Sequence, residues 1–291
     1  MAGGLAGCGQ FAPAYMKPLP AQTRALLAEK GMEENAPILV RIFKAESELE
    51  IWKTKDDGRY YHFKTYPICS YSGKLGPKIK QGDRQAPEGF YVVNKDQMNP
   101  RSKYHLAFNI GFPNAYDRAY GRTGADLMVH GDCTSSGCYA MTDAVVEEIY
   151  ILAREALEGG QSQFQIQAYP FRMTAANMAA QKNHEWYGFW QNLKEGYDYF
   201  ELTRLPPPVA VCERRYLINA AFVNGGNPSP SAACPPYRKM PVVAFKPSKT
   251  PPNMSQASLA KPLGSTLGLA FGAPKQTYRA FTLGPLTPSA K

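Results

Sequence analysis

Residues 130–143 read HGDCTSSGCYAMTD, with two cysteines on either side of a Thr-Ser-Ser-Gly turn. The residues before them, DLMVH (126–130), have the apolar and β-branched character of a strand. The residues after them, TDAVVEEIYILAREAL (142–157), repeat apolar side chains at a helical period. The stretch therefore predicts a strand, a glycine-rich turn and a helix that begins just beyond the second cysteine. Cys133 and Cys138 lie in that turn.

Strand and helix signals alternate on both sides of this stretch. Residues rich in β-branched and aromatic side chains predict strands at 37–44, 49–54, 59–68, 90–93, 104–110, 163–169, 209–212 and 215–218. Periodic apolar residues predict helices at 21–31 and within 174–195, and recurrent Gly and Pro predict a loop at 72–89. The fold class expected is α+β, a mixed β-sandwich or sheet with peripheral helices.

Charge and proline content divide the chain of 291 residues, whose formal net charge is +9. All 24 acidic residues lie within 1–223, whereas residues 224–291 hold 8 Lys or Arg, no acid and 12 of the 25 prolines. A basic, proline-rich segment without acids is typical of extended or disordered chain. We therefore expect an N-terminal segment at 1–35, a folded domain at 36–223 and a disordered basic tail at 224–291.

The six cysteines permit several arrangements. Their spacings lack the paired C-x-x-C units of a structural zinc site, so no metal is expected. In an oxidising compartment, Cys133 can form a disulfide with Cys69, form one with Cys138, or stay reduced and simply pack. Cys212 can pair with Cys234. The sequence leaves these alternatives open.

Leu5-Ala6-Gly7-Cys8 resembles a lipobox, in which the cysteine becomes lipidated. No basic and apolar signal regions precede it here, so two interpretations stay open: an exported protein with a lipid anchor at Cys8, or an accidental match. No stretch approaches the roughly 18–20 apolar residues of a spanning helix. Nothing resembles a motif that reads nucleic acid, so no nucleic-acid partner is expected in spite of the basic tail.

The turn has the residues of a thiol nucleophile with its base. A cysteine near a helix start favours the thiolate, because backbone N–H groups and the helix dipole stabilise negative charge. A turn of eight residues can bring the imidazole of His130 beside the thiol of Cys138, which is the arrangement used in acyl transfer. The backbone N–H groups of Gly137, Cys138 and Tyr139 are placed to hold an oxyanion.

These residues resemble the catalytic segment of the L,D-transpeptidase (YkuD-like) family, in which a His-Gly precedes Ser-His-Gly-Cys. The fit is closest to the YafK-type branch. The similar segments are YHLAFNIGFPNAYDRAYGRTGADLMVHGDCTSSGCYAMTD (104–143), PEGFY (87–91), YPFRMT (169–174), FW (189–190) and GYDYFE (196–201). The chain departs from the broader family at Ser136, which stands for the motif's histidine, and at Ala140, which stands for an arginine.

The resemblance implies a peptidoglycan enzyme without a cofactor. Cys138 is the implied nucleophile on the diamino acid of a stem peptide, and His130 is the implied proton acceptor and donor. Gly131 is the implied carbonyl that orients this histidine, and Gly137 and Tyr139 are implied members of the oxyanion hole. Transfer to an amine would give a 3→3 crosslink or an anchored envelope protein.

Two further outcomes stay open at this point. Transfer to water would make the protein an amidase that releases wall-linked lipoprotein, and a dead site would leave a wall-binding scaffold. The expected partners are stem peptides of peptidoglycan and an envelope lipoprotein or outer-membrane protein. The expected location is the periplasm, with a membrane tether if Cys8 is lipidated.

Three further residues are candidates for substrate binding. Arg122 in GRTG could grip a substrate carboxylate with its guanidinium, or brace its loop through an ion pair. Ser136 adjoins the Gly-Cys pair, and His105 is an alternative base or a supporting residue.

Overall fold

The computed structural model describes residues 12–247 of the chain. Residues 1–11 and 248–291 lie outside the described part. The candidate lipobox cysteine, Cys8, and the greater part of the predicted tail fall in these outer segments.

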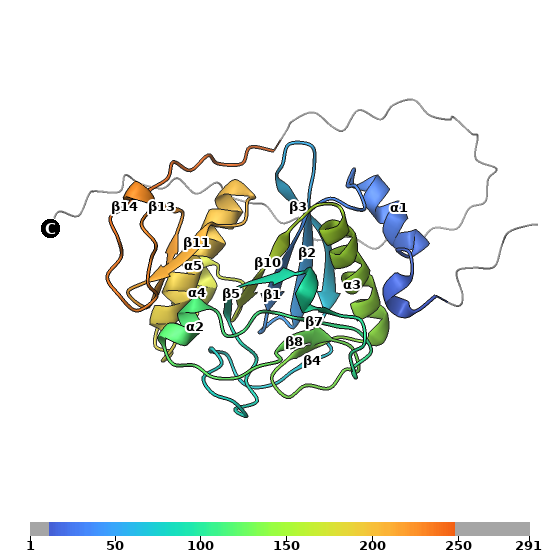
Figure 1. The fold of residues 1–291 in the computed structure, drawn as a ribbon, viewed down its shortest axis with the longest axis horizontal. Helices are drawn as coiled ribbons and strands as arrows, with labels where there is room; N and C mark the ends of the chain where they lie inside the picture. Colours follow the sequence, from blue (N-terminus) through green and yellow to red (C-terminus); the bar gives the residue numbers. More distant parts are fainter. Residues whose placement is uncertain (1–11, 248–291) are drawn as a thin grey trace, which may run out of the picture. The chain divides into compact units, whose positions relative to one another are not determined.

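Two five-stranded mixed sheets form the centre of the described part (Figure 1). The first sheet has the order β3 (Tyr60–Pro67), β2 (Glu48–Thr54), β1 (Ile38–Phe43), β10 (Gln163–Tyr169), β5 (Gly89–Asn94). The second has the order β4 (Ser70–Tyr71), β9 (Tyr139–Ala140), β8 (Met128–His130), β7 (Ala107–Asn109), β6 (Met98–Asn99). Each sheet contains one parallel pair, β1 with β10 and β8 with β9, and its other pairs are antiparallel.

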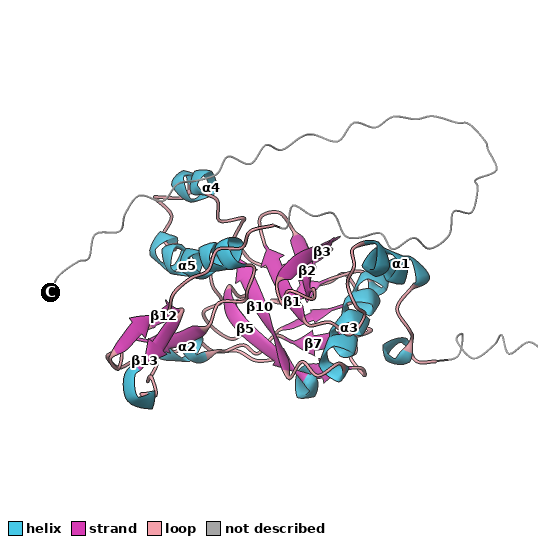
Figure 2. Cartoon of the chain, turned by 90° about the horizontal axis from the view of Figure 1, so that it is seen from above, coloured by secondary structure: helices cyan, strands magenta, loops and turns pink. Residues whose placement is uncertain are grey.

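Helices lie at the periphery, as two groups on opposite sides of the sheets (Figures 1 and 2). One group contains α1 (Ala21–Glu29) and α3 (Asp143–Glu158), with the short 3-10 helix η1 (Ala14–Met16) against α3. The other contains α2 (Ala115–Ala119), α4 (Ala175–Ala180) and α5 (Tyr187–Thr203). Two further 3-10 turns are η2 (Lys95–Gln97) and η3 (Val223–Gly225). The α+β class expected from the sequence is confirmed.

The central strand β1 shows why the sheet is covered on both faces. All six of its residues are buried. Val40 and Ile42 pack into the core shared with α3, whereas Phe43 packs into a second cluster with Trp190 of α5. Because successive side chains of a strand point to opposite faces, burial of every residue requires a layer on each side.

The strand predicted at 104–110 is shorter than expected. Only Ala107–Asn109 pairs as β7. His105 has φ +67°, in the left-handed region that interrupts a strand. No local pattern indicates this break, because histidine and tyrosine next to apolar residues are typical of a strand.

Residues beyond 223 are folded further than a tail that begins at 224 implies. The hairpin β11 (Val209–Cys212) and β12 (Arg215–Ile218) is followed by β13 (Ala220–Phe222), which pairs with β14 (Tyr237–Lys239). A disulfide joins Cys212 to Cys234, with 5.1 Å between their Cα atoms. The backbone N–H of Phe245 donates to the carbonyl of Leu202 in α5. Strand pairing and hydrogen bonds therefore extend beyond residue 223, as far as Phe245.

Candidate active site

The parallel pair of β8 and β9 places the predicted base and nucleophile on one face of the second sheet. Val129 pairs with Tyr139, and both are fully buried in the main core. His130 follows Val129 and Cys138 precedes Tyr139, so alternation directs both of their side chains to the opposite face. The N–H of Met128, the neighbour across the strand pair, donates to Sγ of Cys138 at 3.4 Å.

His130 is held in one orientation and one tautomer. Its ring is 2% exposed, and Nδ1 lies 2.6 Å from the carbonyl oxygen of Gly131. A carbonyl only accepts hydrogen bonds, so Nδ1 is protonated and Nε2 of the neutral ring is free to accept a proton. Burial lowers the pKa of His130, against the opposing effects of the Gly131 carbonyl and the charge of Asp132. The imidazole is thus neutral at physiological pH, as a base must be.

Gly131 fits its place because there is no room for a side chain. A Cβ atom there would lie 2.5 Å from Oδ1 of Asp143 and 2.9 Å from the carbonyl oxygen of Tyr104. The amide of Gly131 donates to the carbonyls of Tyr104 and Leu106 at 3.0 and 3.2 Å. The carbonyl that orients His130 is therefore itself fixed by close backbone packing.

The Cys138 thiol is free and half-buried. Burial raises its pKa, while the N–H of Met128 and the positive charge of Lys78 oppose the rise. The expected helix start beside Cys138 is wrong: β9 follows directly, and α3 begins only at Asp143. The helix dipole is therefore not next to the sulfur, and the neutral thiol needs a base to become a nucleophile.

The amides proposed for the oxyanion hole converge on a side chain that the sequence did not single out. The N–H groups of Gly137 and Cys138 donate to Oγ of Ser135 at 3.3 and 3.1 Å, and this hydroxyl donates to the carbonyl of Cys138 at 2.8 Å. Gly137 has φ +124°, a conformation that favours glycine. A serine three residues before a cysteine is the signal that could have identified this turn.

Tyr139 is placed differently from these amides. It lies in β9, between β4 and β8, and its hydroxyl donates to the carbonyl of Pro87 on the core side. Ser136 is exposed and lies two residues from the thiol.

Arg122 and His105 are each engaged in an ion pair or hydrogen bond. Nη1 of Arg122 donates to Asp117 at 2.9 Å, and both side chains are buried. Nε2 of His105 lies 2.7 Å from Oε1 of Glu147. For Arg122 this is the loop-bracing arrangement. His105 lies beside Gly131: a Cβ added to this glycine would be 3.0 Å from the Cβ of His105.

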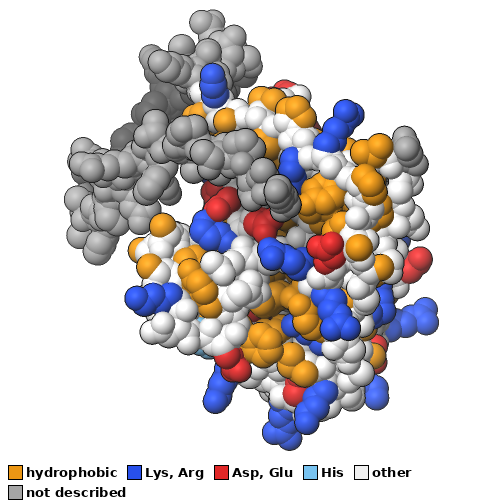
Figure 3. All heavy atoms as spheres, turned by 90° about the vertical axis from the view of Figure 1, so that its left-hand side faces the viewer, with side chains coloured by type: hydrophobic (Ala, Val, Ile, Leu, Met, Phe, Trp, Pro, Cys, Tyr) orange, Lys and Arg blue, Asp and Glu red, His pale blue; other side chains and the backbone are white. Residues whose placement is uncertain are grey.

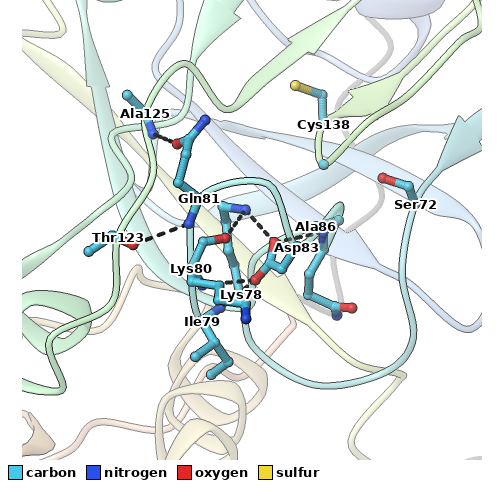
Figure 4. Close-up of polar contacts among 12 residues, drawn as sticks. Ser72, Lys78, Ile79, Lys80, Gln81, Asp83, Ala86, Thr123, Ala125 and Cys138 are labelled. Atoms are coloured by element: carbon cyan, nitrogen blue, oxygen red, sulfur yellow. Dashed lines mark hydrogen bonds and ion pairs between the residues drawn. The ribbon is translucent and has the colours of Figure 1, made fainter.

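The loop at 72–86 forms a wall beside the thiol (Figure 4). Asp83 accepts the N–H groups of Ile79, Lys80 and Gln85, and pairs with the ammonium of Lys78. Gln81 ties the loop to the segment before β8, since its N–H donates to Thr123 and its side chain accepts from the N–H of Ala125. Oγ of Ser72 lies 3.4 Å from Oγ of Ser135.

A buried ion pair fixes the base of this wall. The ammonium of Lys44 donates to the carbonyls of Lys74, Gly76 and Ala86 at 2.8–3.0 Å, and to Glu88 at 3.0 Å. Both charged side chains are 0% exposed. Glu88 also accepts from the N–H of Gly76 and the indole of Trp190. The loop is therefore shaped by the fold before any substrate binds.

A disulfide fixes the turn at 131–138 from the other side. Cys133 is bonded to Cys69, with 5.3 Å between their Cα atoms, and Cys138 is left free. This decides among the pairings that the sequence left open. The N–H of Cys133 also donates to the carbonyl of Met141, so both ends of the turn are attached to the second sheet.

Within residues 12–247 no group of three or more His, Cys, Asp or Glu side chains is arranged to hold a metal ion. No helix in this range has the length and apolar content needed to span a membrane.

Comparison with known proteins connects this geometry to one family. Residues 38–158 match the model of the YkuD L,D-transpeptidase catalytic domain. The chain is 50% identical over 184 residues to the putative L,D-transpeptidase YafK of Escherichia coli K12, which covers 63% of this chain and 74% of that protein. Among solved structures, the helical cell shape determining protein Pgp2 of Campylobacter jejuni is 20% identical, with a TM-score of 0.38, over 62% of this chain and 68% of that one.

Proposed function

The chain belongs to the L,D-transpeptidase family, and from this premise we propose that it is a peptidoglycan enzyme that forms a thioester on Cys138. The observation that supports this most directly is the hydrogen bond between Nδ1 of His130 and the carbonyl of Gly131. It leaves Nε2 as an acceptor on the same sheet face as the thiol.

In the proposed first step, Nε2 of His130 accepts the thiol proton as Sγ of Cys138 attacks a stem-peptide carbonyl. The substrate is the carbonyl of the third residue, a diamino acid. A carbon–sulfur bond forms, and the carbonyl oxygen becomes an oxyanion. When the intermediate collapses, the bond to the terminal D-Ala breaks, and its amine takes the proton from the imidazolium.

The oxyanion would be held by the N–H groups of Gly137 and Cys138. They already converge on one oxygen atom, Oγ of Ser135, which aligns the two donors so that a single oxyanion can share them. Tyr139, the other residue proposed from the sequence for the oxyanion hole, lies within the second sheet between β4 and β8.

In the second step an amine attacks the thioester, His130 takes its proton, and the thiolate of Cys138 leaves and is reprotonated. An amine on another diamino acid gives a 3→3 crosslink, and a lysine of an envelope protein gives an anchored protein. In the hydrolase alternative, the lysine amine of a wall-linked lipoprotein leaves in the first step in place of D-Ala, and water then hydrolyses the thioester.

The two disulfides support a periplasmic location, since such bonds persist in oxidising compartments. Lipidation of Cys8 stays a proposal about a residue outside the described part. Ser136 stays a proposed substrate contact, because it is exposed next to the thiol.

The test incubates the protein and its Cys138→Ala variant with tetrapeptide muropeptides, and separately with cell wall that carries bound lipoprotein. Mass spectrometry reads the products. Loss of D-Ala with new 3→3 dimers, only with the intact thiol, is the expected result. Released lipoprotein or tripeptide without dimers would assign the amidase, and binding without any thiol-dependent change would assign the scaffold.

A further inference from the structure

A cavity of about 410 Å³ lies beside the loop at 72–86. It is formed by Ile79 of that loop together with residues of α2, α5 and the β11–β12 hairpin. In Figure 4 the side chain of Ile79 points away from Cys138. The volume is within the range of roughly 300–1,000 Å³ for small-molecule sites. The α5 and hairpin walls lie outside residues 38–158, the part that matches the catalytic-domain model.

The walls of this cavity combine arginines with aromatic rings. Arg122, Arg214 and Arg215 line it, as do Tyr120 and Trp186. Tyr120 is half exposed, so its ring is available for stacking. On the surface that contains these elements, Lys and Arg side chains are interspersed with hydrophobic ones (Figure 3).

The Arg122 side chain is held in place, but several of its N–H donors have no hydrogen-bond partner. Its guanidinium lies 5.1–5.3 Å from the ring centroids of Tyr116, Tyr120 and Phe189. Asp117 is its one hydrogen-bond partner within residues 12–247, through Nη1, and Nε is buried without a partner. A guanidinium presents five donors, so the ion pair with Asp117 leaves most of them unused.

The second and third arginines are presented by a rigid turn. Cys212 pairs with Arg215, which makes Glu213 and Arg214 the two central residues of the hairpin turn, with φ +51° and +55°. Their N–H groups donate to the carbonyls of Ala232 and Pro230, and the Cys212–Cys234 disulfide fixes the same segment. Holding two non-glycine residues in this conformation requires support from their surroundings, which segment 230–234 provides.

Acidic groups near the cavity do not cancel these donors. Glu185 is the one carboxylate among the residues that line it, against three arginines. Glu195 contacts Arg215 at 3.4 Å in an exposed pair, which contributes little. Arg214 has no ion-pair partner among the described residues.

We propose that this cavity binds an oxyanion, either a carboxylate or a phosphate, carried on a ring that stacks on its aromatic wall. Arginine is the side chain suited to both anions, because its planar fork donates two parallel hydrogen bonds. The inference rests on the proposed function only in naming a carboxylated wall sugar as one source of the anion. A sugar phosphate of another envelope polymer is the second source.

The test uses the Cys138→Ala protein, so its result does not depend on turnover. The indole N–H signal of Trp186, identified with Trp186→Phe, is followed by NMR during titration. The probes are N-acetylmuramic acid, glucosamine 1-phosphate and N-acetylglucosamine, which lacks the anion. We expect a saturable chemical-shift change with at least one of the two anionic sugars. The dissociation constant of the neutral sugar should be at least about tenfold larger. The anionic sugar that binds with the smaller dissociation constant identifies whether the anion is a carboxylate or a phosphate.

Arg214→Ala should weaken anion binding by about tenfold or more, since a charged hydrogen bond is lost. Arg101→Ala, an exposed arginine on the segment after β6, is the matched control and should bind as the parent does. Thermal unfolding checks that each variant is folded. Equal binding of the neutral sugar, no shift with any probe, or equal effects of the two arginine variants would overturn the proposal.

Discussion

The phenol ring of Tyr104 lies over the imidazole of His130, with 4.8 Å between the ring centroids and 36° between their planes. Tyr104 is 46% exposed, whereas His130 is 2% exposed. The tyrosine therefore covers the proposed base from the solvent side, and its backbone carbonyl holds Gly131 at the same time.

Removal of this cover should move the pH dependence of the reaction. Burial is the main cause that lowers the pKa of His130. In Tyr104→Ala water reaches the ring, so the pKa should rise toward about 6.5. Because the base must be neutral, the acidic limb of kcat/KM should move to higher pH, with a smaller effect above pH 8. Tyr104→Phe keeps the ring and serves as control; an acidic limb at the same pH in all three proteins would contradict this role.

Ser135 and Ser136 are neighbours with different expected roles. Ser135→Ala removes the oxygen that holds the amides of Gly137 and Cys138, so the sulfur should lose its position and kcat should fall by about tenfold, with little change in KM. Ser136→Ala leaves these hydrogen bonds intact and should mainly raise KM. Steady-state kinetics on stem peptides separates the two. A rise in KM for Ser135→Ala together with a fall in kcat for Ser136→Ala would show that Ser135 does not position the sulfur.

The two disulfides should differ in their effect on activity more than in their effect on stability. They join cysteines 64 and 22 residues apart, and loop entropy predicts losses of about 4 and 3 kcal/mol when each is removed as a double Cys→Ser variant. The Cys69/Cys133 variant loosens the catalytic turn and should lose most of its activity at temperatures where it is still folded. The Cys212/Cys234 variant is its control. Urea unfolding and product formation measure the two effects, and equal activity losses would argue against a special role for the first bond.

The buried pair of Lys44 and Glu88 should be far more sensitive than a surface pair. Lys44→Met leaves the Glu88 carboxylate buried without its cation, which costs about 3–5 kcal/mol of unfolding free energy. Lys64→Met, which breaks a pair with Glu148 where the lysine is 37% exposed, should cost about 1 kcal/mol or less. Chemical denaturation compares them. A similar loss in both variants would mean that the loop at 72–86 does not depend on the buried pair.

The sequence predicts much of this fold because its signals are local. The helix predicted at 142–157 is observed as α3, Asp143–Glu158, since its apolar period matches one buried face. Thr142 occupies the N-cap position, but its side chain makes no capping hydrogen bond. The pairing of Cys69 with Cys133 depends on the order of strands β4, β9 and β8, which no local pattern encodes.

The candidate site shows the same division. His130, Gly131, Gly137 and Cys138 lie within nine residues of sequence, so a motif can identify them. Lys44 and Glu88 act on the site through a loop, and the two arginines of the hairpin turn depend on a segment predicted as tail. Contacts between residues this far apart follow from tertiary packing, and hydrophobic periodicity does not report them.

The unpaired cysteine also has a consequence for how the chain matures. In the order of synthesis, the described cysteines are Cys69, Cys133, Cys138, Cys212 and Cys234, and both native bonds join successive members once Cys138 is set aside. A chain oxidised as it emerges can close the first bond before Cys138 appears. When Cys212 arrives, Cys138 is the competing thiol among the described cysteines. Early burial of the Cys138 thiol between β8 and the loop at 72–86 would keep it out of that exchange.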